Sequence, residues 1–120
     1  LLNDTIVTRS DLERITSIPV LGVIARNYSG SMLLSDQNPK SIIFEGFRAL
    51  RSNLSFLQES NLAKKVYLVT SSVSGEGKTY VAENLAIVFA KSGKKTIVVG
   101  ADLRRPRLYS DFNLNYARDP

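Results

Sequence analysis

The feature that most constrains the fold of this chain is a glycine-rich turn between an apolar segment and a helical pattern. Residues 72–79 read Ser-Val-Ser-Gly-Glu-Gly-Lys-Thr. Before them, Val66–Val69 has the length and composition of a β-strand, and from about residue 78 to residue 91 the apolar side chains recur at helical spacing. A strand that runs through such a turn directly into a helix favours an α/β fold.

Residues 72–79 have the properties of a phosphate-binding loop. We expect the backbone N–H groups from Gly75 to Thr79 to point into one concavity, where the positive end of the following helix adds to their attraction for an anion. Lys78 is expected to reach the β- and γ-phosphates of a nucleotide, and the Thr79 hydroxyl to ligate Mg²⁺. The alternative is an ordinary glycine-rich turn with an exposed lysine, because Ser72 stands where the usual pattern begins with glycine.

These considerations predict a site for ATP or ADP with Mg²⁺. The predicted nucleotide-binding residues are Ser74, Gly75, Glu76, Gly77, Lys78, Thr79 and Tyr80.

A second apolar run of strand length, residues 95–99, follows Gly93, which is the expected cap of the helix before it. A strand, a helix and a strand within about 35 residues predict a βαβ unit over residues 65–108. Asp102 would then lie beside the loop as a Mg²⁺ ligand or catalytic base, or it simply caps the next turn. The predicted fold class is α/β, a P-loop NTPase-like parallel β-sheet flanked by helices.

The N-terminal half contains three further predicted elements and one loop. Ser10–Glu13 fits the capping box of a short helix, Val20–Ala25 has the pattern of a strand, and Arg26–Lys40 reads as a loop. A helix is expected from Ser41 onward. Its predicted apolar stripe consists of Ile43, Phe47, Leu50, Leu54 and Leu57. The buried side of the helix over residues 78–91 is predicted to consist of Val81, Leu85, Val88 and Phe89.

Composition excludes several chemistries. The chain has no cysteine and no histidine, which excludes thiolate and histidine catalysis and leaves carboxylate, lysine, hydroxyl and backbone groups. The net charge of +5 favours anionic partners, namely a nucleotide, a nucleic acid or a membrane surface. No apolar run approaches the roughly 20 residues that span a bilayer. Because the chain opens at Leu1 without a leader pattern, we expect it to be an excerpt of a longer protein.

In four segments that follow the same order, the chain resembles the bacterial tyrosine kinases, which are autokinases of capsule and exopolysaccharide export. Residues 11–24 are similar to the family's lead-in segment, and residues 75–79 to its Walker A loop. Residues 101–106 match most of its Walker A′ motif, D-x-D-x-R. The resemblance implies an ATP-dependent, non-specific protein-tyrosine autokinase with Lys78 and Asp102 as catalytic residues, and with Thr79 and Asp102 at the metal.

The fourth segment lies on the helix that begins after Ser41. Glu45, Arg48 and Arg51 match the family's E-x-x-R-x-x-R pattern, which implies self-association into a ring-like homo-oligomer. Spacing alone favours a solvated helix face. The resemblance also implies a membrane co-polymerase region in the same chain or a partner chain, and a place at the cytoplasmic face of the bacterial inner membrane. Nucleic-acid binding is not expected.

The chain departs from the family in ways that keep other functions open. Ser74 replaces a usual proline, and Gly100 stands where the first Walker A′ aspartate belongs, which leaves a non-catalytic nucleotide-binding regulator of polysaccharide chain length as an alternative. A partition or septum-type P-loop ATPase switch is the other alternative, although Val73 stands where that class has lysine.

The predicted organisation is one incomplete domain. Residues 1–120 form the N-terminal portion of a P-loop kinase domain, with the lead-in segment and oligomerisation helix over residues 1–60. Walker B and a tyrosine-rich tail are expected after Pro120, so the fragment by itself is expected to be inactive. Tyr67 is predicted to be a core residue rather than a substrate.

Overall fold

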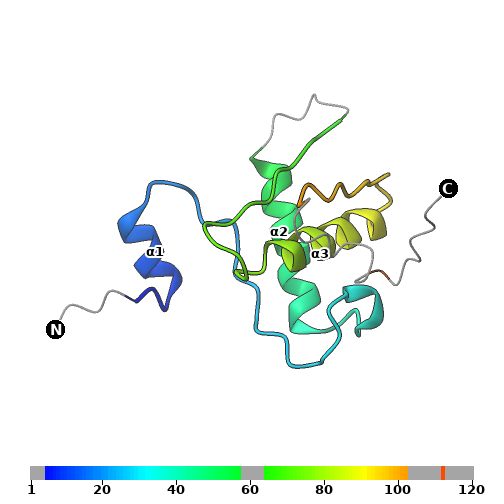
Figure 1. Ribbon diagram of the computed structural model, residues 1–120, viewed down its shortest axis with the longest axis horizontal. Helices are drawn as coiled ribbons and strands as arrows, with labels where there is room; N and C mark the ends of the chain where they lie inside the picture. Colours follow the sequence, from blue (N-terminus) through cyan, green and yellow to red (C-terminus); the bar gives the residue numbers. More distant parts are fainter. Residues whose placement is uncertain (1–4, 58–63, 103–111, 113–120) are drawn as a thin grey trace.

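The computed structural model describes residues 5–57, 64–102 and 112, and the regular elements of these residues are three α-helices and a short 3-10 helix. The elements are α1 (Arg9–Ile15), η1 (Leu34–Asp36), α2 (Ile42–Phe56) and α3 (Lys78–Lys91). Figure 1 shows α2 and α3 packed against each other, with η1 at the same helix pair and α1 set apart from it. The α2–α3 pair is therefore the centre of the described structure.

Helix α2 begins where the sequence predicts it. Its N-cap is Ser41, whose hydroxyl accepts the N–H of Phe44 at 3.2 Å. In the predicted stripe, Ile43 and Phe47 are buried, and Leu50 and Leu54 are half-buried. Leu57 lies past the last turn and is exposed. The prediction missed Phe44, which is also buried, because the face that packs in the core is wider than a single line of residues.

Helix α3 has the predicted bounds, and Gly93 ends it as predicted. Gly93 has a φ of +83°, in the left-handed region that glycine adopts easily. Its N–H donates to the carbonyl of Ala90 at 2.9 Å, and the N–H of Lys94 donates to that of Phe89 at 3.2 Å. This pair of hydrogen bonds is a Schellman motif, which satisfies carbonyls that the helix end leaves open.

The core lies between α2, α3 and η1. Its buried hydrophobic residues are Leu34, Ile43, Phe44, Phe47, Leu85 and Val88. On α3 the predicted side is confirmed, since Leu85 and Val88 are buried and Val81 and Phe89 pack half-buried against the cluster. The loop predicted over residues 26–40 contributes Leu34 through η1, which the sequence pattern did not indicate.

Helix α1 has a different cap from the one predicted. The capping box is formed by Thr8 and Asp11, not by Ser10 and Glu13. The N–H of Thr8 donates to Asp11 Oδ2 at 2.9 Å, and the N–H of Asp11 donates to the Thr8 hydroxyl at 3.3 Å. Glu13 instead pairs with Arg9, one turn earlier, at 2.7 Å. Two cap patterns overlap in this sequence, and the earlier one starts the helix.

The predicted α/β fold with a parallel sheet is wrong for the described residues, because none of residues 5–57, 64–102 and 112 belongs to a β-strand. Alternating apolar side chains favour an extended backbone, but a strand also needs a neighbour that pairs with its N–H and C=O groups. The two predicted strands beside α3 therefore leave one set of side chains uncovered. Four residues of these segments are each at least 80% exposed, namely Val66, Leu68, Ile97 and Val99.

The intervening side chains of these segments do pack. Tyr67 is half-buried, and its ring stacks on that of Phe89 with 5.4 Å between centroids, so its predicted core position holds in part. Residues 103–108 of the predicted βαβ unit lie outside the described residues. Among the described helices, none is both long enough and apolar enough to cross a membrane.

Candidate functional site

Loop 72–79 turns sharply into α3 through two glycines. Gly75 has a φ of +90° and Gly77 a φ of +94°. Residues that carry a Cβ rarely adopt these backbone conformations. Ahead of them, the Ser71 hydroxyl donates to the carbonyl of Val73 at 2.9 Å. The two glycines of the loop therefore stand at the positions where the backbone takes left-handed torsion angles.

The side chain of Glu76 closes this loop on itself. Its Oε2 accepts the N–H of Ser72 at 2.8 Å and that of Val73 at 3.2 Å. The sequence had suggested only the backbone of Glu76 as a phosphate contact. The carboxylate is exposed, so it contacts the loop while remaining in solvent.

The start of α3 differs from the starts of the other two α-helices. Thr8 and Ser41 cap α1 and α2 with side-chain hydrogen bonds, whereas the N-cap of α3 is Gly77, which has no side chain to do so. The first turn of α3 contains no acidic residue and begins with Lys78. Helix N-termini carry partial positive charge on unpaired N–H groups, so this start is suited to an anion. Lys78 and Thr79 are both half-buried.

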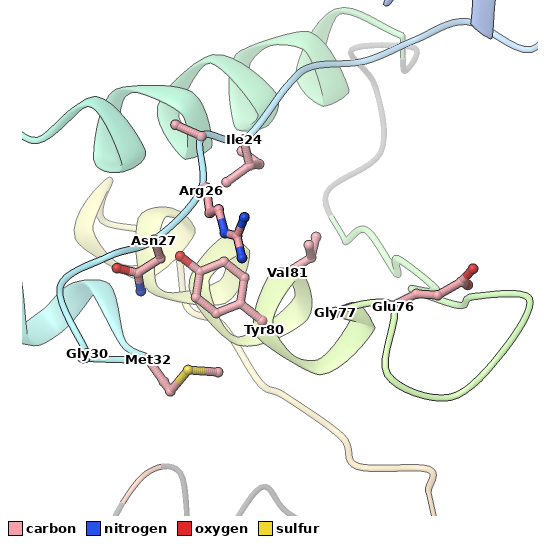
Figure 2. Close-up of a pocket in the computed structure, with 10 residues that line it drawn as sticks. Ile24, Arg26, Asn27, Gly30, Met32, Glu76, Gly77, Tyr80 and Val81 are labelled. Carbon is pink, nitrogen blue, oxygen red and sulfur yellow. The ribbon is translucent and has the colours of Figure 1, made fainter. Parts of the chain in front are cut away.

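A cavity of about 420 Å³ adjoins the loop, between the segment over residues 24–32 and the first turn of α3 (Figure 2). Its lining consists of Ile24, Ala25, Arg26, Asn27, Gly30, Met32, Glu76, Gly77, Tyr80 and Val81. Figure 2 shows the Arg26 guanidinium and the Asn27 amide near the ring of Tyr80. Burial raises the pKa of Tyr80, whose buried hydroxyl meets no hydrogen-bond partner among the described residues. The sequence indicated Tyr80 but neither Arg26 nor Asn27.

Tyr80 is held from its other side by the core. Its ring meets that of Phe47 edge-on, with centroids 5.8 Å apart and planes at 66°. Edge-to-face contact is a favoured arrangement of two aromatic rings. The cavity is thus anchored through Tyr80 to the α2–α3 core.

Asn84 joins the other cavity wall to α3. This residue is completely buried. Its Oδ1 accepts the N–H of Leu34 at 2.7 Å, and its Nδ2 donates to the carbonyls of Met32 and Tyr80, each at 2.9 Å. Asn84 is not among the residues predicted from the sequence, although its place between Val81 and Val88 in the helical stripe indicates that it faces the core.

The two predicted metal ligands come from the first turn of α3 and from the segment that follows this helix. Asp102 is exposed at the end of the segment that follows α3, and Thr79 is half-buried in its first turn. Within the described part of the chain, no group of three or more acidic side chains is arranged to hold a metal ion. A magnesium site at Thr79 and Asp102 therefore stays a prediction.

The three residues of the predicted oligomerisation helix have separate environments. Arg48 pairs with Glu45 on the surface of α2, and its guanidinium lies 4.7 Å from the ring centre of Phe44. Arg51 is half-buried and donates from Nη1 to the carbonyl of Val88 at 3.1 Å. That carbonyl belongs to the last turn of α3, where carbonyls lack partners within the helix. Arg51 thus connects α2 to α3, while Glu45 and Arg48 lie at the surface.

Comparison with known proteins gives a consistent result. No family model matches the chain. It is 43% identical over 76 residues to tyrosine-protein kinase YwqD of Bacillus subtilis (strain 168), a match that covers 63% of this chain and 32% of that protein. It is 38% identical over 84 residues to the putative tyrosine-protein kinase CapB of Staphylococcus aureus, covering 70% of this chain and 36% of that protein. The chain thus spans about a third of the length of these relatives.

A solved structure is similar as well. The crystal structure of the chimerical protein CapA2B2 matches with a TM-score of 0.79 and 38% sequence identity. The match covers 90% of this chain and 46% of that one. Over the span that these proteins match, the chain belongs to the family of bacterial tyrosine kinases.

Proposed function

We propose that the chain carries the nucleotide-binding part of an ATP-dependent protein-tyrosine autokinase that acts in capsule and exopolysaccharide biosynthesis and export. The observation that carries this proposal is loop 72–79, with two left-handed glycines leading into a helix that has no side-chain cap. The similarity of the chain to tyrosine-protein kinases supports it.

The described residues fit the polyphosphate of ATP or ADP. The N–H groups from Gly75 to Thr79 precede or open the first turn of α3, and that turn has no side-chain cap and no acidic residue. Lys78 adds a positive charge at the same place. The 420 Å³ cavity shares Gly77 with the loop and would leave room for the sugar and base. Ser74, Glu76 and Tyr80 complete the proposed binding residues.

In this proposal the bound nucleotide with Mg²⁺ supplies the phosphoryl group that a tyrosine hydroxyl accepts. Lys78 would offset the negative charge of the phosphates, and the Thr79 hydroxyl would hold the metal. Asp102 would either complete the metal shell or accept the proton of the attacking hydroxyl, since the chain has no histidine for that role. Preorganised charges of this kind act mainly on the transition state.

A second candidate is a nucleotide-binding regulator of polysaccharide chain length without kinase activity. Gly100 favours it, because the Walker A′ pattern has a carboxylate at that position and this chain keeps only Asp102. Both candidates require nucleotide binding at the loop. Phosphotyrosine on the full-length protein distinguishes them.

The proposal includes self-association and a membrane partner. Glu45 and Arg48 are exposed or half-exposed on α2 and so are available to a second copy, whereas the guanidinium of Arg51 is engaged with α3. We expect Glu45→Ala with Arg48→Ala to lower the oligomer mass of the full-length protein in light scattering. The matched control removes the exposed pair of Arg9 and Glu13 on α1 and should leave the mass unchanged. An unchanged mass in both double variants contradicts the assembly role.

The membrane part of the proposal follows the family. It places a co-polymerase region in the same chain or a partner chain, and the kinase at the cytoplasmic face of the bacterial inner membrane. Cell fractionation of the native protein, with and without the co-polymerase region, tests this placement.

The central experiment is calorimetry of the full-length protein with Mg-ATP and Mg-ADP. We expect Lys78→Met to weaken binding by about tenfold or more, as loss of one charge-assisted contact implies, and to abolish phosphotyrosine. Lys94→Met, an exposed lysine beyond the other end of α3, is the control and should bind like the original protein. Absence of binding to the unmodified protein would overturn both candidate functions.

A further inference from the structure

We propose that the side chain of Glu76 is a positioning residue that braces loop 72–79 in its phosphate-receiving shape before a nucleotide binds. The inference rests on the proposed function, because it concerns the loop that would hold the phosphates. The sequence motif assigned only the backbone N–H of Glu76 to phosphate binding. The proposal adds a role for its side-chain carboxylate.

The brace consists of two hydrogen bonds that connect the Glu76 carboxylate to the backbone at the beginning of the same loop. One carboxylate oxygen, Oε2, accepts the N–H groups of both Ser72 and Val73, at 2.8 and 3.2 Å. These donors lie four and three residues before Glu76, so the hydrogen bonds span the first half of the loop. A carboxylate that accepts backbone N–H groups forms charge-assisted hydrogen bonds, which are stronger than neutral ones.

The position of Glu76 in the chain explains why a brace is needed. The residue stands between Gly75 and Gly77, both in the left-handed region. Glycine has the largest backbone freedom of any residue, so two glycines this close together make an ordered loop entropically costly. Fixing the loop in advance reduces the ordering that ligand binding would otherwise require.

The direction of the side chain separates this role from direct ligand contact. Figure 2 shows the Glu76 carboxylate turned away from the ring of Tyr80 and the other labelled side chains of the cavity. Its negative charge is bound by N–H groups at the beginning of the loop, whereas Lys78 and the uncapped N–H groups stand at its end. The carboxylate therefore does not occupy the amides that the proposal assigns to phosphate.

The test compares two substitutions in the full-length protein. Glu76→Gln keeps a side-chain oxygen that accepts the same N–H groups, while Glu76→Ala removes it. We expect the alanine variant to bind Mg-ADP about tenfold more weakly in calorimetry, and the glutamine variant to stay within about threefold of the original protein. Glu13→Ala, at an exposed glutamate of α1, is the control and should leave the affinity unchanged.

Hydrogen exchange of the nucleotide-free protein provides a readout that does not depend on nucleotide. The amides of Ser72 and Val73 should exchange faster in Glu76→Ala and remain protected in Glu76→Gln. Unchanged exchange in the alanine variant overturns the brace, and faster exchange with an unchanged affinity overturns the positioning role. The original protein could bind no nucleotide although the alanine variant exchanges faster at Ser72 and Val73. In that case the proposed function and the positioning role both fail, but the hydrogen bonds of the brace are confirmed.

Discussion

The side-chain Oδ1 of Asn84 accepts the backbone N–H of Leu34 at 2.7 Å, across 50 residues of sequence. The same amide donates to the carbonyls of Met32 and Tyr80. One fully buried side chain thus satisfies backbone groups of the loop before α2 and of α3 at once. This contact keeps the segment that walls the cavity against the helix that begins at Lys78.

Replacement of Asn84 by alanine should destabilise the protein strongly. It leaves the buried N–H of Leu34 and the carbonyl of Met32 without partners, so we expect a loss of about 3 kcal/mol in the free energy of unfolding. Urea denaturation measures this loss. Asn53→Ala is the matched control, because Asn53 donates to the carbonyl of Leu21 from an exposed position. Equal losses in the two variants would contradict the role of Asn84.

Two phenylalanines of α2 offer a test of the core. Phe47 is completely buried and contacts Tyr80, whereas Phe56 is 88% exposed at the end of the same helix. We expect Phe47→Ala to cost about 4 kcal/mol of stability, since it leaves a cavity between α2 and α3. Phe56→Ala should change stability by no more than about 0.5 kcal/mol. Thermal and urea unfolding of both variants decide the point, and a large loss at Phe56 would show that this face is covered.

The cap of α1 should depend on pH. The backbone N–H of Thr8 lowers the pKa of Asp11 below its ordinary value of 3.8, and the Thr8 hydroxyl and the N–H of Val7 contribute further. Because the folded-state pKa is depressed, the stabilisation is present above pH 3.8 and is lost as the pH falls through the folded-state value. NMR titration of the Asp11 carboxyl carbon measures this pKa. Thr8→Ala should move it back toward 3.8, and a midpoint at or above 3.8 in the original protein would contradict the cap.

Arg51 and Arg48 should differ in their effect on stability although they lie one turn apart. Arg51→Ala removes the hydrogen bond to the carbonyl of Val88 and is expected to cost about 1 kcal/mol in unfolding free energy. Arg48→Ala removes a solvent-exposed ion pair with Glu45 and should cost less than about 0.5 kcal/mol. Denaturant unfolding in low and high salt compares them. A larger loss at Arg48 would contradict the assignment of Arg51 as the link between the two helices.

The sequence alone determined the bounds of α3, the start of α2 at Ser41 and the left-handed cap at Gly93. It also placed the glycines of loop 72–79, because the hydrogen bonds and torsion preferences that decide these features act within about five residues. The same local rules failed at α1 only where two cap patterns overlapped, and there Thr8 prevailed over Ser10. The family could also be predicted from the sequence, because four short motifs occur in the family's order.

Tertiary structure alone decided the features that depend on distant partners. Whether residues 66–69 and 95–99 become strands depends on pairing with another strand, and among the described residues no such pairing forms. The burial of Asn84 and the contact of Arg51 with Val88 each join groups at least 37 residues apart. Periodicity states which side of a helix is apolar, but not which polar groups will find partners across the core, since those hydrogen bonds exist only once the helices have packed.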